Sequence, residues 1–360
     1  MNGEKIIAAM SGGVDSSVAA HLLVEQGFEV CGLFMKNWEE DDSETHCAAA
    51  RDREDAESVC RKLGIEFRTV NFAHEYWERV FREFLRECEA GRTPNPDILC
   101  NREIKFHQFL LRAEALGAGR IATGHYARRC GNGRGMQLLR GADRAKDQSY
   151  FLHAVHPGAL ARTVFPLGGL SKGEVRAIAR KQNFRTHDKK DSTGICFIGE
   201  KNFRAFLARY LPPRPGDFVS LDDGAALGEH AGLMFYTLGQ RHGLGIGGAG
   251  AAWYVARKNT ADNTIALVQG HDHPALFSTC ATVDDVRWIG GAPAVDGGGA
   301  FHCRAQHRYR QAAAACRVVV DGGACRVHFN APQRAVTPGQ SMVFYDGEVC
   351  LGGGVIGGAR

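Results

Sequence analysis

Short apolar runs alternate with amphipathic stretches along the first 130 residues, a pattern typical of an α/β domain built on a parallel sheet. Each run that predicts a strand is followed by apolar positions at helical spacing, and most of these stretches end at a glycine. We expect strands at 6–10, 30–35, 67–72 and 120–126, and helices at 18–26, 53–63, 76–89 and 104–116. A further helix over 171–183 begins with a capping box formed by Ser171 and Glu174.

The pattern changes after residue 204. A proline-rich segment at 211–216 breaks the chain, and glycine-rich turns and a predicted hairpin of 253–257 with 264–269 follow it. Later segments are short and β-like, among them 317–320, 325–329 and 341–345, which predicts a small barrel or sandwich. We therefore expect three domains: an α/β domain at 1–204, a small central domain at 205–273 and a β-barrel at 274–360.

Composition narrows the class of protein. With 44% hydrophobic and 23% charged residues among 360, the chain is neither disordered nor fibrous. The net charge of +4 permits an acidic partner, but a nucleic-acid surface would have to be local. We find no secretory signal and no apolar run of about 18 residues, so we expect no membrane partner and a cytoplasmic location. The 12 cysteines are then thiols, and because none form a C-x-x-C pair we expect neither zinc nor an iron–sulfur cluster.

The sharpest local feature is the heptad from Ser11 to Ser17, which lies between a predicted strand and a predicted helix. Its glycines let backbone N–H groups converge at a helix N-terminus, which attracts an anion. The heptad is neither a Walker A loop nor G-x-G-x-x-G. Asp15 supplies a carboxylate suited to Mg²⁺. The plain alternative is a serine-capped strand–helix turn.

Two cysteines lie in distinctive segments. Cys100 follows a proline-stiffened loop near a helix N-terminus, which predicts a lowered thiol pKa, and Asp97 in the same loop is a candidate general acid/base. Cys196 follows a Ser-Thr-Gly turn behind the cationic pair Lys189-Lys190. Taken alone, either cysteine is more often an inert, structural one, and the sequence does not place the two together.

Longer motifs point to a family. The heptad SGGVDSS resembles the pyrophosphate-loop (PP-loop) signature of ATP pyrophosphatases, which cleave ATP to AMP and pyrophosphate to adenylate a substrate. Together with that heptad, six further motifs resemble those of the tRNA-specific 2-thiouridylase family: GLFMKNW (32–38), PNPDILCN (94–101), KDQSYFL (146–152), DSTGICFIGE (191–200), TLGQRHGLGIGG (237–248) and VTPGQ (336–340). They extend from the first predicted strand almost to the last.

The resemblance implies an adenine-nucleotide α-hydrolase-like PP-loop domain followed by a small central domain and a C-terminal β-barrel. It implies ATP-dependent 2-thiolation of the wobble uridine, U34, in tRNAs for lysine, glutamate and glutamine. Sulfur would come from a cysteine desulfurase, directly or through a relay carrier protein. Cys196 would carry the persulfide, Cys100 would be the nucleophile, and the two would form a transient disulfide. Either the persulfide attacks C2 directly, or Cys100 first releases hydrosulfide.

The resemblance also implies binding residues. The ATP-binding set is Ala9, Met10, Ser11, Gly12, Gly13, Val14, Asp15, Ser16, Met35 and Gly124. The tRNA-binding set is Asn95, Pro96, Asp97, His125, Lys146, Asp147, Gln148, Arg308, Tyr309 and Gln340. From position alone, Met35 could be core packing, His125 a structural histidine, and the basic cluster at 304–310 a solvated barrel face.

Three other functions are compatible with parts of the sequence. An amide-forming ligase would use the same loop without sulfur, but the two cysteine motifs argue against it. A non-catalytic tRNA-binding protein would not need the intact glycines, Asp15 and Ser16 of the loop. A cluster-dependent thiolase would need a C-x-x-C pair, which this chain does not have.

Overall fold

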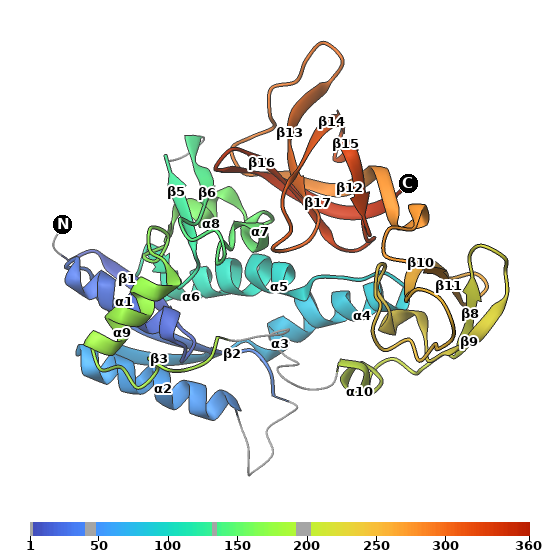
Figure 1. Cartoon of the computed structure of the whole chain (residues 1–360). Helices are drawn as coiled ribbons and strands as arrows, with labels where there is room; N and C mark the ends of the chain where they lie inside the picture. The colour runs from blue at the N-terminus through green and yellow to red at the C-terminus, as the bar shows by residue number, and fades with distance from the viewer. Residues whose placement is uncertain (1–2, 40–47, 132–134, 192–202) are drawn as a thin grey trace.

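The first domain is built on a five-stranded parallel sheet with the strand order β3-β2-β1-β4-β7, seen at the left of Figure 1. The computed structural model describes residues 3–39, 48–131, 135–191 and 203–360. The strands are β1 (Lys5–Met10), β2 (Glu29–Lys36), β3 (Glu66–Asn71), β4 (Arg120–Ala122) and β7 (Thr163–Val164). The predicted parallel-sheet α/β domain is confirmed.

Helices cover both faces of this sheet, which explains why its central strands are continuous apolar runs. Ile6 and Ala8 of β1 pack in one apolar cluster with three helices, whereas Ile7, between them, packs in a second cluster with α6 on the opposite face. The three helices of the first cluster are α1 (Val14–Glu25), α2 (Ala48–Leu63) and α9 (Lys172–Lys181). Helix α9 has the predicted capping box, with the Ser171 side chain accepting from the Glu174 N–H.

The order of the strands creates a topological switch point. The chain leaves β1 toward β2 and β3 on one side and later returns to place β4 on the other side of β1. Open α/β sheets bind ligands in the crevice beyond the carboxyl ends of the strands at such a point. The heptad that begins at Ser11 and the segment that begins at Thr123 follow those two strand ends directly.

Two long helical runs extend from the sheet toward the other domains (Figure 1). The first consists of α3 (Ala73–Tyr76), the π-helical turn η1 (Trp77–Phe81) and α4 (Arg82–Glu89); the second consists of α5 (Pro96–Leu99), the π-helical η2 (Cys100–Gln108) and α6 (Phe109–Ala115). Helix α5 packs against η1, so the two runs touch. The second run begins eight residues earlier than predicted, because Asn95 caps it and Pro96 occupies its first position.

Other predicted boundaries are also wrong. Helix α2 begins at Ala48 rather than at residue 53. Helix α1 begins at Val14 rather than at residue 18, because its N-cap is Gly13 and polar residues form its first turn. The strand predicted over 120–126 ends at Ala122. Beyond it the backbone of Tyr126 bonds to Gln148 rather than to a strand: its N–H donates to Oε1 at 3.0 Å and its carbonyl accepts from the Gln148 N–H at 2.9 Å.

The middle domain is a small four-stranded sheet with the order β10-β11-β8-β9. Its strands are β8 (Gly216–Ser220), β9 (Ala226–His230), β10 (Trp253–Asn259) and β11 (Thr264–Gln269), and the short helix α10 (Phe203–Leu207) precedes them. Strands β10 and β11 are antiparallel, which confirms the predicted hairpin.

The C-terminal domain is a closed β-barrel, because its first strand pairs with its last. Its strands are β12 (Phe277–Trp288), β13 (Ala300–Gln306), β14 (Ala314–Asp321), β15 (Ala324–Arg334), β16 (Ser341–Asp346) and β17 (Val349–Ala359). A hairpin of the first domain, β5 (Ala127–Cys130) and β6 (Gln137–Arg140), extends this sheet beside β17. The barrel is thus attached to the first domain by strand pairing, a contact that the sequence analysis missed.

Short helices α7 (Ser149–Leu152) and α8 (Pro157–Ala161) complete the first domain. In the described part of the chain, the helices lack the combination of length and apolar character that a membrane span needs.

Candidate active site

The glycine loop holds a strained backbone that only glycine accepts easily. Gly12 has φ +72°, and a Cβ placed on it would lie 2.2 Å from the carbonyl oxygen of Asp52. The next residue, Gly13, is the N-cap of α1 and carries no capping side chain. The first N–H groups of α1 therefore receive no side-chain cap from Gly13, which is the arrangement that binds a phosphate at a helix N-terminus.

Serine side chains fix the shape of the loop. The Ser16 hydroxyl accepts from the Ser11 N–H at 3.2 Å and donates to the Gly13 carbonyl at 3.1 Å. The Ser17 hydroxyl donates to the same carbonyl at 2.8 Å and lies 2.9 Å from the Thr186 hydroxyl. Ser16 and Ser17 are both buried. These hydroxyls hold the loop in one conformation before any ligand arrives.

The other residues of the predicted ATP-binding set meet at the switch point. Gly124 follows β4, and a Cβ on it would lie 3.0 Å from the backbone nitrogen of Ser16, so this position must be small for the loop to pack. Met10 and Val14 are buried, so only their backbones can face a ligand, while Ala9 and Met35 are partly buried at the edge of the apolar cluster on the opposite face of the sheet.

Asp15 is the centre of a charged network. Lys172, the first residue of α9, donates to both carboxylate oxygens of Asp15 at 2.8 Å, and the Tyr126 hydroxyl donates to Oδ1 at 2.8 Å. Lys172 also lies 2.8 Å from the carboxylate of Asp191. Lys172 therefore links the glycine loop to Asp191, the last described residue before the segment that contains Cys196.

Two further cationic side chains donate hydrogen bonds to Asp191. Lys146 donates to it at 2.6 Å and Arg176 at 3.0 Å. Burial alone would raise the pKa of Asp191, but hydrogen bonds and charges from Lys146 and Lys172 outweigh it and hold the pKa at about 2. The site therefore concentrates cations around the carboxylates of Asp15 and Asp191.

A second lysine, Lys189, contacts the glycine loop on the side of α2. Lys189 donates to the Gly12 carbonyl at 2.9 Å, to Asp52 at 2.6 Å and to Asp55 at 2.7 Å. Burial alone would lower the pKa of Lys189, but its two carboxylate partners raise it. Lys189 stays protonated and ties α2 to the glycine loop.

The predicted thiol site lies in the second helical run. Asn95 accepts from the Asp97 N–H at 3.2 Å, and Cys100, fully buried, lies one turn further along. Within the described residues, Oδ1 of Asp97 is buried without a hydrogen-bond partner. An unpaired carboxylate oxygen one turn before a cysteine is available for a ligand. Cys196 lies outside the described residues, as does most of its motif.

Some predicted tRNA-binding residues also hold the thiol segment in place. Gln340 donates to the Thr93 carbonyl at 2.6 Å, two residues before Asn95. The His125 ring packs 5.6 Å from the Phe106 ring of η2, and burial, with the nearby charge of Lys105, lowers its pKa to about 3. His125 is therefore neutral near pH 7.

The segment 146–148 is also tied into the fold. Asp147 is buried, and its carboxylate accepts from the N–H groups of Gly141 and Ser149, from the Ser149 hydroxyl and from Arg140, at 2.9–3.0 Å. Helix α7, which follows Gln148, packs against α5 and η2. Asp147 thereby fixes the segment beside the thiol helix.

The basic cluster of the barrel reaches the middle domain. Arg308 donates to the Leu238 carbonyl at 2.8 Å and to the Thr337 hydroxyl at 3.0 Å. Tyr309 packs 4.4 Å from Phe151 of α7. These residues join all three domains next to the thiol segment.

Sequence reasoning did not connect the glycine loop with the polar side chains of the network around it: Tyr126, Lys172, Arg176, Lys189 and Asp191. Lys172 appears in the sequence only as the first residue of a capped helix, and its partner Asp15 is 157 residues away. The one available signal was the cationic pair Lys189-Lys190 beside the Cys196 motif.

A parallel sheet with an uncapped glycine loop and a cation cluster at its switch point defines a nucleotide-binding α/β enzyme of the PP-loop class. Three family models match consecutive parts of the chain: the tRNA methyl transferase HUP domain at 4–200, the tRNA methyl transferase PRC-barrel domain at 204–269 and the aminomethyltransferase beta-barrel domain at 278–356. The chain belongs to the tRNA-specific 2-thiouridylase family and is a tRNA-modifying enzyme.

Relatives match almost the whole chain. The tRNA-specific 2-thiouridylase MnmA of Hahella chejuensis is 57% identical over 357 residues, which cover 98% of this chain and 97% of that protein. The protein of the same name from Marinobacter nauticus is 56% identical over 360 residues, covering 98% of this chain and 91% of that protein. The fold and the family expected from the sequence are both confirmed.

Proposed function

We propose that this enzyme replaces the 2-oxygen of the wobble uridine of tRNA by sulfur, with ATP converted to AMP and pyrophosphate. The observation that carries the proposal is the uncapped N-terminus of α1 at the switch point, with Asp15 and Lys172 beside it. A carbonyl oxygen is a poor leaving group. Transfer of AMP from ATP to that oxygen would make it a good leaving group, and this site is built to bind the phosphates of ATP.

In the first step, the uridine 2-oxygen attacks the α-phosphorus of ATP and pyrophosphate leaves. The N–H groups of the glycine loop and the ammonium of Lys172 stabilise the charge that develops on the departing phosphates. Gly124 leaves room for the loop to approach the nucleotide, and Lys189 holds the Gly12 carbonyl away from it.

Mg²⁺ fits this site as a partner of ATP. In the described part of the chain no three His, Cys, Asp or Glu side chains are grouped to hold a metal. Mg²⁺ in ATP-using enzymes needs only one or two carboxylates in addition to phosphate oxygens and waters. Asp15 would provide that carboxylate once the ion replaced Lys172 at one of its two oxygens, and the ion would neutralise phosphate charge when bound.

In the second step, sulfur displaces AMP at C2. If the terminal sulfur of a Cys196 persulfide attacks directly, the C2–O bond breaks and AMP leaves with the oxygen. The Cys100 thiolate then attacks the Cys196 sulfur, which frees 2-thiouridine and forms a disulfide between the two cysteines. In the alternative order, Cys100 first attacks the Cys196 sulfur and hydrosulfide leaves to attack C2. Cellular thiols then reduce the disulfide by exchange.

Asp97 would move the proton in this second step. Its Oδ1 is buried and lacks a partner among the described residues, and Cys100 follows one helical turn later. A carboxylate in that position can take the thiol proton of Cys100 or orient the uracil ring. The tRNA contacts would come from Asn95 and Pro96 at the base, with His125, Lys146, Gln148, Arg308, Tyr309 and Gln340 around it.

The test is incubation with ATP, Mg²⁺, a sulfide or persulfide source and unmodified tRNA for lysine, followed by nucleoside mass spectrometry. We expect a mass gain equal to the exchange of one oxygen for sulfur, at the wobble uridine and only with ATP. An amide-forming ligase would instead release pyrophosphate with a small acid and without tRNA. If neither thiolation nor tRNA-dependent pyrophosphate release occurs, the proposal is wrong.

A further inference from the structure

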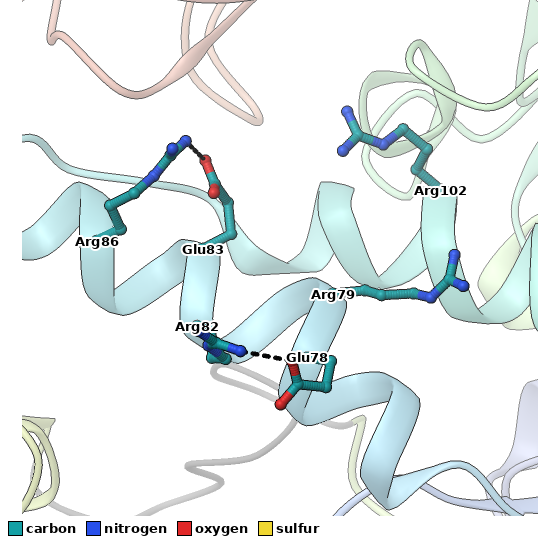
Figure 2. Close-up of a pocket in the computed structure, with 6 residues that line it drawn as sticks. All are labelled: Glu78, Arg79, Arg82, Glu83, Arg86 and Arg102. Carbon is teal, nitrogen blue, oxygen red and sulfur yellow. Dashed lines mark hydrogen bonds and ion pairs between the residues drawn. The ribbon is translucent and has the colours of Figure 1, made fainter.

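A groove lined only by charged side chains lies between the two long helical runs. Its volume is about 400 Å³, and it is lined by Glu78, Arg79, Arg82, Glu83, Arg86 and Arg102. Figure 2 shows Arg79, Arg82 and Arg86 leaving the run η1–α4, whereas Arg102 leaves a neighbouring helix, η2. Nothing in the chemistry described above uses these arginines.

Arg82 and Arg86 are held only by weak partners, whereas Arg79 and Arg102 both pair with the less exposed Glu103, at 3.6 and 2.7 Å. Arg82 pairs with Glu78 and Arg86 pairs with Glu83, each at 2.6 Å, and these two arginine side chains are 63% and 71% exposed. Exposed pairs within one helix contribute little to stability, because water and salt compete for both charges. A polyanion can therefore displace the glutamates at small cost.

The position of the groove connects it with the thiol segment. Arg102 lies two residues after Cys100 on the same helix, and η1, which carries Arg79, packs against α5. Helix α5 begins directly after Asn95, in the segment proposed to hold the target base. A nucleotide chain whose base reaches Asp97 would pass close to these guanidinium groups.

We propose that Arg79, Arg82, Arg86 and Arg102, the arginine groove, bind phosphates of the tRNA backbone next to the nucleotide that enters the active site. This inference rests on the proposed function. Guanidinium groups form bidentate bonds with phosphates. A protein partner is less suited, because a protein interface has an apolar or aromatic centre, and none of the lining residues is apolar.

The test measures binding of an unmodified, fluorescently labelled tRNA transcript by anisotropy at several KCl concentrations. Each phosphate contact contributes about 0.7–0.9 to the slope of log affinity against log salt concentration. The double variant Arg82→Gln/Arg86→Gln is expected to lower that slope by about 1.4–1.8. The matched control is Arg61→Gln, because Arg61 is 77% exposed and pairs with Glu57 on α2 at the i, i+4 spacing of Arg82 and Glu78. We expect its slope to equal that of the wild type.

A second variant distinguishes phosphate binding from a structural role. Glu83→Gln removes the intramolecular partner of Arg86. It is expected to tighten tRNA binding several-fold at low salt, whereas a helix that needs the pair would gain nothing in affinity and would unfold at a lower temperature.

The outcomes separate this inference from the proposed function. If the wild type thiolates tRNA but the double variant keeps the wild-type salt slope, the arginine groove does not bind tRNA phosphates. If the double variant instead loses only sulfur delivery from a carrier protein, the groove belongs to that protein and our inference is wrong. If the wild type neither binds nor thiolates tRNA, both proposals fail.

Discussion

Two neighbouring glycines of the phosphate loop should respond in opposite ways to the same substitution. Gly12 has φ +72°, and a Cβ on it would overlap the Asp52 carbonyl at 2.2 Å. Gly13 has φ −96°, and the nearest atom to its Cβ would be the Ser11 hydroxyl at 3.4 Å, an ordinary contact. Gly12→Ala therefore strains the backbone and pushes α2 away, whereas Gly13→Ala does neither.

The expected effects can be stated as free energies. A left-handed backbone costs an alanine about 1–2 kcal/mol, and an overpacked contact typically adds about 1–3 kcal/mol. Gly12→Ala should thus lower the free energy of unfolding by about 2–5 kcal/mol. Gly13→Ala should change it by less than about 1 kcal/mol, because an alanine with an allowed φ restricts the unfolded chain and can stabilise slightly.

Urea unfolding of both variants, followed by circular dichroism, measures these differences. Folded Gly12→Ala protein, assayed at low temperature, should also release pyrophosphate at least tenfold more slowly with tRNA, because its loop N–H groups are displaced. Equal losses of stability in the two variants would refute the geometry given for the loop. The same geometry would be refuted if the Gly12→Ala variant had the stability and the turnover of the wild type.

Four further predictions concern the chemistry and the charges. Cys196→Ser should abolish thiolation while tRNA-dependent pyrophosphate release continues; full thiolation would remove Cys196 from the reaction. Asp97→Asn should lower kcat while the KM for tRNA stays nearly constant, and an unchanged kcat would exclude a proton-transfer role. Lys172→Met should slow pyrophosphate release by roughly 10–100-fold, since a hydrogen bond to a charged group contributes about 1.5–3 kcal/mol; the exposed Lys181→Met on the same helix is the control and should match the wild type. Burial lowers the pKa of Lys258 from 10.5 to about 8, so the folded protein gives up this proton before the unfolded chain does, and the Lys258 contribution to stability should rise by up to about 3 kcal/mol between pH 8 and 10.5. Urea unfolding across that pH range should show the rise in the free energy of unfolding in the wild type and not in Lys258→Met. If the free energies of the two proteins change with pH in parallel, this prediction is wrong.

The sequence predicted the features that depend on local patterns. The strand ending at Met10 and the capped helix after Ser171 follow from periodicity and capping chemistry, and both are present in the structure. The start of α1 was placed four residues too late because its N-cap, Gly13, has no side chain to signal it. Ser17, the last residue of the heptad, is buried, and its bond to Thr186, 169 positions away, could not be predicted from a local pattern.

The features that depend on contacts between distant residues could not be predicted. No local pattern indicates that Lys172 reaches Asp15, or that the hairpin of β5 and β6 extends the barrel beside β17. Gln340 was expected to contact tRNA, and the structure adds that it bonds to Thr93 and so supports the thiol segment. Motifs predict candidate site residues, while the network of charges around Asp15 is visible only in three dimensions.

The most direct test of the account follows one oxygen atom. A tRNA labelled with ¹⁸O at C2 of the wobble uridine would be thiolated by the enzyme with ATP, and the AMP analysed by mass spectrometry. If the 2-oxygen is adenylated and then displaced by sulfur, the label must appear in the phosphate group of AMP, in amounts equal to the 2-thiouridine formed. Label found in water or in pyrophosphate, with unlabelled AMP, would contradict adenylation at the phosphate loop.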